Sequence, residues 1–290
     1  MSHSQYHVRS ISLPSRLHPT SLNVVTELNK LKTWEGSDSD TASSVQAEMI
    51  KSGLAGLAEL YNCVQELIHC PQTQQALLRG SHNQGKYVEN LLDMSVGLLD
   101  VCGSARELLL LMKEHIQDLQ SALRRKGLDS SIKDHIHAYV CFRKKAKREI
   151  SNGLKSLKTM ENSYKSFPLL DLDYHLLMVV NLLRELCTIT ISFFRKLLFF
   201  MHVTLLKKHT RRWSLFSGSD RGTRIVGGID IALCFFHGRV RKTNAKADIQ
   251  IVKRRLEEIE GSIKELEAGV DCIFKCLIQH RVSLLNLFTH

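Results

Sequence analysis

Apolar residues recur every three or four positions over most of the chain, which is the spacing of one face of an α-helix. The first regular run begins at Val45 and stops before Pro71, because a residue that precedes proline disfavours the helical conformation. A longer run of the same period follows. The pattern predicts helices over 41–70 and 84–126.

The second half of the chain predicts three more long helices, over 129–166, 169–212 and 243–290. The helix over 169–212 is apolar around most of its circumference, so we expect it at the centre of the fold. Its longest charge-free apolar stretches, 174–183 and 197–206, are ten residues each. A helix needs about 20 apolar residues to cross a bilayer. We therefore do not expect this helix to span a membrane.

The last helix carries a heptad pattern, in which residues from Ile249 to Leu287, all apolar except His280, follow one another in alternating steps of three and four. This spacing is typical of coiled-coil packing. Phe274 and Ile278 widen the apolar face beyond the narrow seam of a dimer, which favours packing within one chain. We therefore predict an all-α fold, an elongated antiparallel helical bundle with a long heptad-patterned C-terminal helix.

The N-terminal residues differ from the rest in lacking a sustained apolar period. Residues 1–40 are interpreted as a flexible tail and linker that contains a short helix over 21–34, with Leu28 and Leu31 facing inward. Residues 41–290 are predicted to form a single helical-bundle domain, with a flexible connection at about 214–242.

Composition and charge narrow the function classes. A content of 43% hydrophobic residues in 290 suffices for a sizeable core, and eight scattered cysteines with no leading hydrophobic segment favour a reducing, cytoplasmic location. The net charge of +11 is concentrated in residues 121–255, which hold 28 basic and 10 acidic groups. Such a field favours acidic partners without choosing among them.

Two basic clusters stand out within this region. The first is a candidate interaction patch that also matches a nuclear-import pattern; it consists of Arg143, Lys144, Lys145, Lys147 and Arg148. The alternative reading is an ordinary solvated helix face. Aromatic residues are not interleaved among these charges, which argues against nucleic acid as the partner.

The second basic cluster follows the apolar helix and is a candidate lipid-facing patch; it consists of Lys207, Lys208, Arg211, Arg212 and Trp213. Cations and a tryptophan beside an apolar helix suit an anionic membrane surface. The same residues also suit a charged helix C-terminus, where cations interact favourably with the helix dipole.

The sequence gives no positive sign of catalysis. Cys272, Cys276 and His280 share one helix face, but buried thiols explain them better than a metal site, since no fourth ligand is marked. No phosphate-binding glycine loop, nucleophile elbow or paired-carboxylate motif occurs. We expect no enzyme activity, no cofactor, no metal and no small-molecule substrate.

The N-terminal tail contains a candidate phosphorylation site. Arg9, Ser12 and Pro14 fit the phosphopeptide pattern that 14-3-3 proteins bind, with arginine three residues before the phosphoserine and proline two after. A tail that is never modified is the alternative. The acid-free start, which contains serine and arginine, also leaves plastid import open.

Several motifs, in one order along the chain, carry a family resemblance: RSISLPSR, LNKLKTWE, PQTQQAL, LLDMSVGLLDVCG, DLQSALRR, LLDLD, WSL and RVSLLN. With them the chain resembles the plant-specific BYPASS-like proteins. The resemblance implies a helical plant protein involved in root and shoot development through a signalling route, and it carries over no catalytic residue. Between Phe216 and Lys242 the chain departs from the family pattern, so no partner contact is carried over for that connection.

Overall fold

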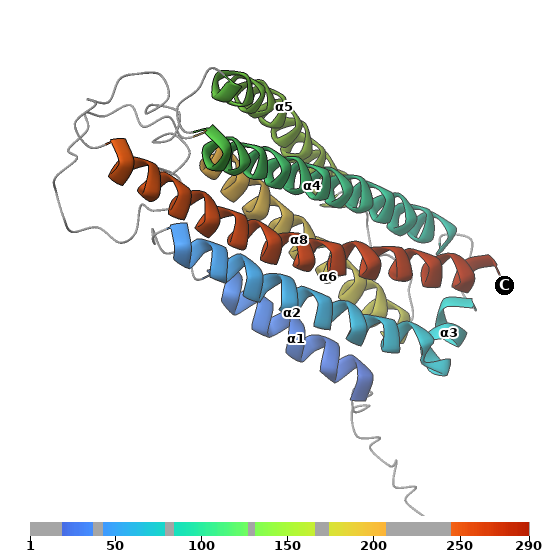
Figure 1. The fold of residues 1–290 in the computed structure, drawn as a ribbon. Coiled ribbons are helices and arrows are strands. Elements are labelled where there is room, and N and C mark those ends of the chain that lie inside the picture. The colour runs from blue at the N-terminus through green and yellow to red at the C-terminus, as the bar shows by residue number, and fades with distance from the viewer. Residues whose placement is uncertain are drawn as a thin grey trace, which may run out of the picture.

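The computed structural model describes residues 19–36, 43–78, 84–126, 131–165, 174–206 and 245–289. Within these ranges every residue except Cys70 lies in a helix, and the helices pack antiparallel, as Figure 1 shows. Their bounds are α1 Pro19–Gly36, α2 Ser43–His69, α3 Pro71–Leu78, α4 Gln84–Lys126, α5 Ser131–Lys165, α6 Tyr174–Leu206 and α8 Ala245–Thr289. The predicted all-α class and the antiparallel bundle are confirmed.

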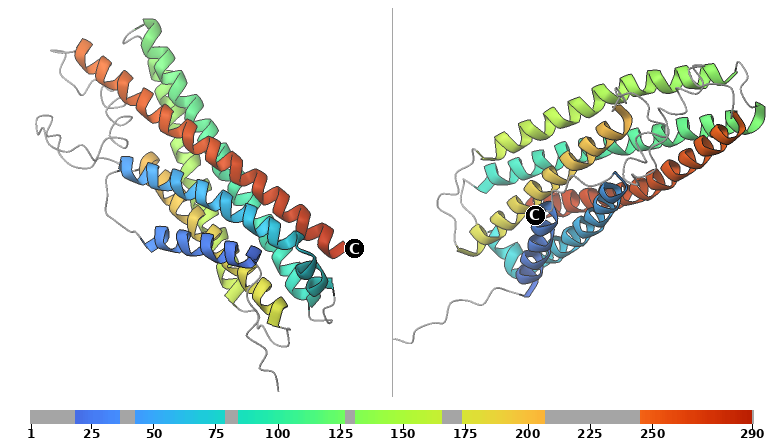
Figure 2. Two further views of the ribbon diagram at one scale, coloured as in Figure 1. Left: turned by 90° about the horizontal axis from the view of Figure 1, so that it is seen from below. Right: turned by 90° about the vertical axis from the view of Figure 1, so that its left-hand side faces the viewer.

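Helix α6 occupies the centre, because it packs against α1, α2, α3, α4 and α5. Helix α4 packs against α8 and α5, and α8 also packs against α2. Helices α1 and α5 therefore lie at opposite edges of the bundle, as Figures 1 and 2 show. By length and composition alone, the segment Tyr174–Val203 of α6 could cross a membrane, yet 61% of its most apolar window is buried inside the bundle.

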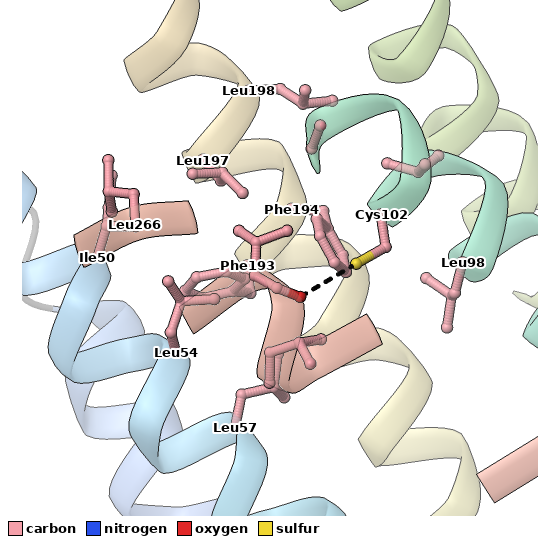
Figure 3. Packing of buried hydrophobic residues seen from close by; sticks show 14 of the residues in the cluster. Ile50, Leu54, Leu57, Leu98, Cys102, Phe193, Phe194, Leu197, Leu198 and Leu266 are labelled. Atoms are coloured by element: carbon pink, nitrogen blue, oxygen red, sulfur yellow. Dashed lines mark hydrogen bonds between the residues drawn. The ribbon is translucent and has the colours of Figure 1, made fainter. Parts of the chain in front are cut away.

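The core is formed where α2, α4, α6 and α8 meet, and Figure 3 shows part of it. Leu54 and Leu57 of α2 are buried here together with Phe193 and Phe194 of α6. The Cys102 thiol also lies here and donates a hydrogen bond of 3.8 Å to a backbone carbonyl of α8. Each fully buried Leu or Phe contributes about 1.5–3 kcal/mol through the removal of apolar surface from water.

Two prolines mark helix starts. Pro19 is the first residue of α1 and Pro71 the first of α3, positions where the missing N–H has no partner to lose. At Cys70 the chain turns between α2 and α3, and its backbone amide still bonds to the carbonyl of Leu67 at 3.2 Å. A single non-helical residue therefore separates α2 from α3. The predicted helix end at residue 70 differs by one residue from the observed end at His69.

Helix α1 is longer than the predicted 21–34 and is packed into the bundle. Leu28 and Leu31 are buried, as expected. Trp34 donates from its indole Nε1 to the carbonyl of Met49 at 2.9 Å and stacks on Phe193 with ring centroids 5.6 Å apart. The division of the chain into tail and single domain stays a prediction.

Helix α8 buries a row of side chains from Val252 to Leu284. Coiled-coil packing of this helix stays a prediction. Phe274 is half-buried beside Gly103, where an added Cβ would approach its ring at 3.9 Å. Ile278, by contrast, is exposed, so it does not widen the buried face.

Candidate interaction surface

Helix α5 is the most basic helix, with nine Lys and Arg residues against three acidic ones. Its inner face, which includes Tyr139, Ala146 and Ile150, is buried against the bundle. Among the described helices it packs only against α4 and α6, so its other side faces solvent. The period of the apolar residues therefore turns the cations outward.

The candidate interaction patch lies in the middle of this helix. Lys144, Lys145, Lys147 and Arg148 are exposed, whereas Arg143 is half-buried with its guanidinium 6.0 Å from the ring centre of Tyr139. The Nζ of Lys145 lies 4.0 Å from Glu107 of α4, and Nε of Arg148 lies 3.9 Å from Glu149. Exposed pairs at such distances are weak, so both cations can exchange these partners for another.

Three members of the patch continue into a longer row. The row consists of exposed residues spaced so that they share one face of α5: Lys144, Lys147, Arg148, Lys155 and Lys158. We call it the basic ridge. At about 1.5 Å per residue it extends over about 21 Å. Lys155 and Lys158 were not predicted as part of the patch, because they stand apart from the contiguous run of charges in the sequence. Their helical spacing from Lys144 is the signal that identifies them.

The outer face of α6 adjoins α5 and carries an exposed aromatic ring. Phe199 is 60% exposed. Its neighbour Leu198 lies against α5 at Gly153, where an added Cβ would approach Cδ1 at 2.9 Å. One turn earlier, Arg195 forms an ion pair with Glu161 of α5. The side of the bundle that carries the basic ridge thus also presents a large apolar group to solvent.

Two sets of candidate residues fall outside the described part of the chain. These are the phosphorylation motif of Arg9, Ser12 and Pro14, and the lipid-facing patch of Lys207, Lys208, Arg211, Arg212 and Trp213.

Cys272, Cys276 and His280 lie along one face of α8 but differ in exposure. Cys272 is exposed, whereas Cys276 and His280 are buried. Burial raises the pKa of the Cys276 thiol to about 11 and lowers the pKa of His280 to about 4, and the His280 ring packs edge-on against Tyr61 at 5.5 Å. Among the described residues, no three His, Cys, Asp or Glu side chains are grouped to hold a metal ion.

The buried thiols of the interior are poor nucleophiles. Burial raises the pKa of Cys102 and of Cys187 to about 12. Only the thiolate reacts as a nucleophile or binds a metal, so both groups are held in their unreactive form at neutral pH. These cysteines act as small apolar side chains of the core.

The chain matches a known protein family over most of its length. The family model described as "Protein BPS1" matches residues 53–287. The chain belongs to the BPS1 (BYPASS1) family. No curated protein and no solved structure matches it significantly.

The BPS1 match begins within α2 and ends within the last turns of α8. It therefore includes the basic ridge and Phe199, while α1 and the tail motif around Ser12 precede it. The resemblance to BYPASS-like proteins is confirmed, and membership of the family suggests a BYPASS-like role.

Proposed function

We propose that this BPS1-family protein is a non-enzymatic regulatory protein that acts in root and shoot development by binding a partner protein with an acidic surface. The observation that carries the proposal is the basic ridge on α5, with its five exposed cations on one face of a single helix. A rigid row of charge raises the rate of encounter with an acidic surface and fixes the orientation of the bound partner.

The local charge balance supports this use of the ridge. Glu149, the acidic residue nearest in sequence, is half-buried and lies 3.9 Å from Arg148 alone. Lys144, Lys147, Lys155 and Lys158 make no ion pair with another described residue. For most of the ridge, a partner with carboxylates at matching intervals would therefore displace no ion pair within the described part of the chain.

The proposed site of action is the cytoplasm, with the nucleus or a plastid as alternatives. A second contact is proposed for the tail, where phosphorylated Ser12 would bind a 14-3-3 protein. That contact would be switchable, whereas the basic ridge is always present.

Proximity labelling in plant roots tests the main proposal. We expect the triple variant Lys144→Glu, Lys147→Glu, Lys155→Glu to lose the acidic partners that the unchanged protein labels. The matched control, Arg254→Glu with Lys275→Glu, reverses exposed charges on α8 and should keep them. If the two variants label the same proteins, the ridge is not the contact surface.

A second candidate function is peripheral binding to an anionic membrane, and exposed Phe199 is the observation that favours it. An aromatic ring that enters the interfacial region beside cations is typical of such proteins. Residues 207–213, which carry the lipid-facing patch, directly follow α6 in the sequence.

Flotation with phosphatidylserine vesicles separates the two candidates. Membrane binding requires salt-sensitive flotation that is lost in Phe199→Ser and in the variant with Lys207, Lys208, Arg211 and Arg212 changed to Glu. Protein that stays at the bottom of the gradient at low salt would exclude this second function.

A further inference from the structure

A second surface, away from the basic ridge, combines exposed apolar residues with carboxylates that make no ion pair with other described residues. Three residues of α8, spaced by four and three, are exposed: Ile278 by 42%, Val282 by 47% and Leu285 by 36%. Val96 of α4 is 39% exposed. We call these four residues the apolar seam.

The contacts between α4 and α8 bring the members of the apolar seam together. Arg281, which precedes Val282, donates hydrogen bonds of 2.7 Å to the carbonyl of Leu92 and to Oγ of Ser95. Ser95 precedes Val96 in α4. Because the two helices run antiparallel, Val96 lies opposite the turn of α8 that holds Ile278 and Val282.

Carboxylates line the α4 side of the seam. Glu89, Asp93 and Asp100 are exposed, and their spacing of four and seven places them on one outward face of α4, beside Val96. None of the three makes an ion pair with another described residue. We call them the acidic border.

No described helix covers this face. Helix α4 packs against α5, α6 and α8, while α8 packs against α2, α3 and α4. In Figure 1, α4 and α8 lie in front, with no other helix before them. Contiguous exposed apolar residues that are rimmed by polar ones commonly mark an interaction site.

We propose that the apolar seam and acidic border bind a basic amphipathic α-helix of a partner protein. Two antiparallel helices leave a shallow groove along which a third helix packs at about 20°. Its apolar residues would cover Ile278, Val282 and Leu285, while its lysines or arginines would pair with Asp93 and Asp100.

Charge decides between this occupant and the alternatives. A second copy of the chain would bring one acidic border against another, and an anionic membrane would meet the same repulsion. The chain as a whole carries +11, so a basic helix is repelled by most of the molecule. The carboxylates of the acidic border must therefore determine where such a helix binds.

The test uses the full chain and a fluorescent synthetic helix of about 18 residues, with leucines on one face and lysines on the other. We expect saturable binding by fluorescence anisotropy that weakens as salt is added. The double variant Ile278→Ser, Val282→Ser should weaken binding by about tenfold or more. Asp93→Lys with Asp100→Lys should weaken binding and remove its salt dependence.

Matched controls lie on α4, away from the apolar seam. Leu110 is 38% exposed and Glu114 is exposed, and both belong to α4 beyond the seam. Leu110→Ser and Glu114→Lys should bind the peptide as the unchanged protein does. A peptide with glutamate in place of lysine should show no dependence on the seam, so the seam variants and the unchanged protein should bind it equally. Circular dichroism should show the same helix content for every variant.

Other outcomes would overturn the proposal. Equal peptide binding by the seam variants and the controls would show that the seam is not the site. A concentration-dependent dimer that the seam variants abolish would identify a second copy as the occupant. Flotation with phosphatidylserine vesicles that the seam variants abolish would identify a membrane instead.

Discussion

The packing of α1 on α2 depends on a glycine, and replacing it gives a prediction with a definite sign. A Cβ added at Gly53 would lie 2.5 Å from Cζ2 of Trp34 and 3.0 Å from a ring carbon of Phe193. These are rings held by packing, so Gly53→Ala must displace the indole that bonds to Met49. Overpacking of this kind costs about 1–3 kcal/mol.

Gly261 of α8 provides the matched control, because an added Cβ there meets nothing within 4 Å. Alanine is favoured over glycine inside a helix by about 1 kcal/mol, and this gain in stability applies equally to Gly53→Ala and Gly261→Ala. The difference between the unfolding free energies of the two variants therefore isolates the packing cost. We expect Gly261→Ala to be the more stable by about 1–3 kcal/mol.

Urea unfolding followed by tryptophan fluorescence measures this difference. The background variant Trp213→Phe removes the other tryptophan, so the signal reports Trp34 alone. Gly53→Ala should lower the midpoint and shift the native emission of Trp34 toward that of a solvated indole. If Gly53→Ala and Gly261→Ala raise stability equally, the described packing of α1 on α2 is wrong.

Three further predictions concern single groups. Burial lowers the pKa of His280 from 6.5 to about 4. As the pH falls from 6.5 to 4, the unfolded chain therefore binds a proton that the folded chain does not, and the free energy of unfolding decreases. In urea titrations over this pH range, His280→Leu should lose less stability than the unchanged protein. The Tyr61 hydroxyl is hydrogen-bonded to the Thr190 hydroxyl at 3.1 Å, and the Thr190 hydroxyl also donates to the carbonyl of Leu186. Thr190→Val leaves the buried Tyr61 hydroxyl without its partner, whereas in Tyr61→Phe the Thr190 hydroxyl keeps its bond to Leu186. Thr190→Val should therefore lower the melting temperature more than Tyr61→Phe. A peptide spanning His7–Leu17 should bind a plant 14-3-3 protein in calorimetry only when Ser12 is phosphorylated, and equal binding by both forms would refute the motif.

The long helices could be predicted because their apolar period is sustained over many turns. For α4, the predicted bounds of 84–126 agree with the structure. For α6, the predicted range of 169–212 contains the described helix Tyr174–Leu206, and the predicted residues at either end lie outside the described part of the chain. A helix start depends on which of several polar residues caps it, and the sequence between 169 and 173 offers two aspartates.

The packing of α1 could not be predicted, because it rests on tertiary contacts. Its apolar residues are sparse, and its attachment depends on Gly53 and Gly56 of α2, where added Cβ atoms would meet Trp34 and Leu31. A period within α1 cannot show which glycines of another helix will face it. The stability of this helix therefore appears only when the partner surface is known.

The candidate surfaces, too, could be predicted from the sequence only in part. The cluster around Lys144 was found as a run of charges, whereas Lys155 and Lys158 required the helical spacing to be followed further. The apolar seam was misread from sequence, since Ile278 was assigned to a wider buried face and is instead exposed. Which apolar residues stay uncovered depends on how many helices surround α8.

Complementation of a plant that lacks the protein tests the central claim most directly. The variant Lys144→Glu, Lys147→Glu, Lys155→Glu should accumulate normally and keep its helix content, yet fail to restore root and shoot growth. The control Arg254→Glu, Lys275→Glu should restore both. Full restoration by the ridge variant would contradict the account, because the basic ridge would then play no part in what the protein does.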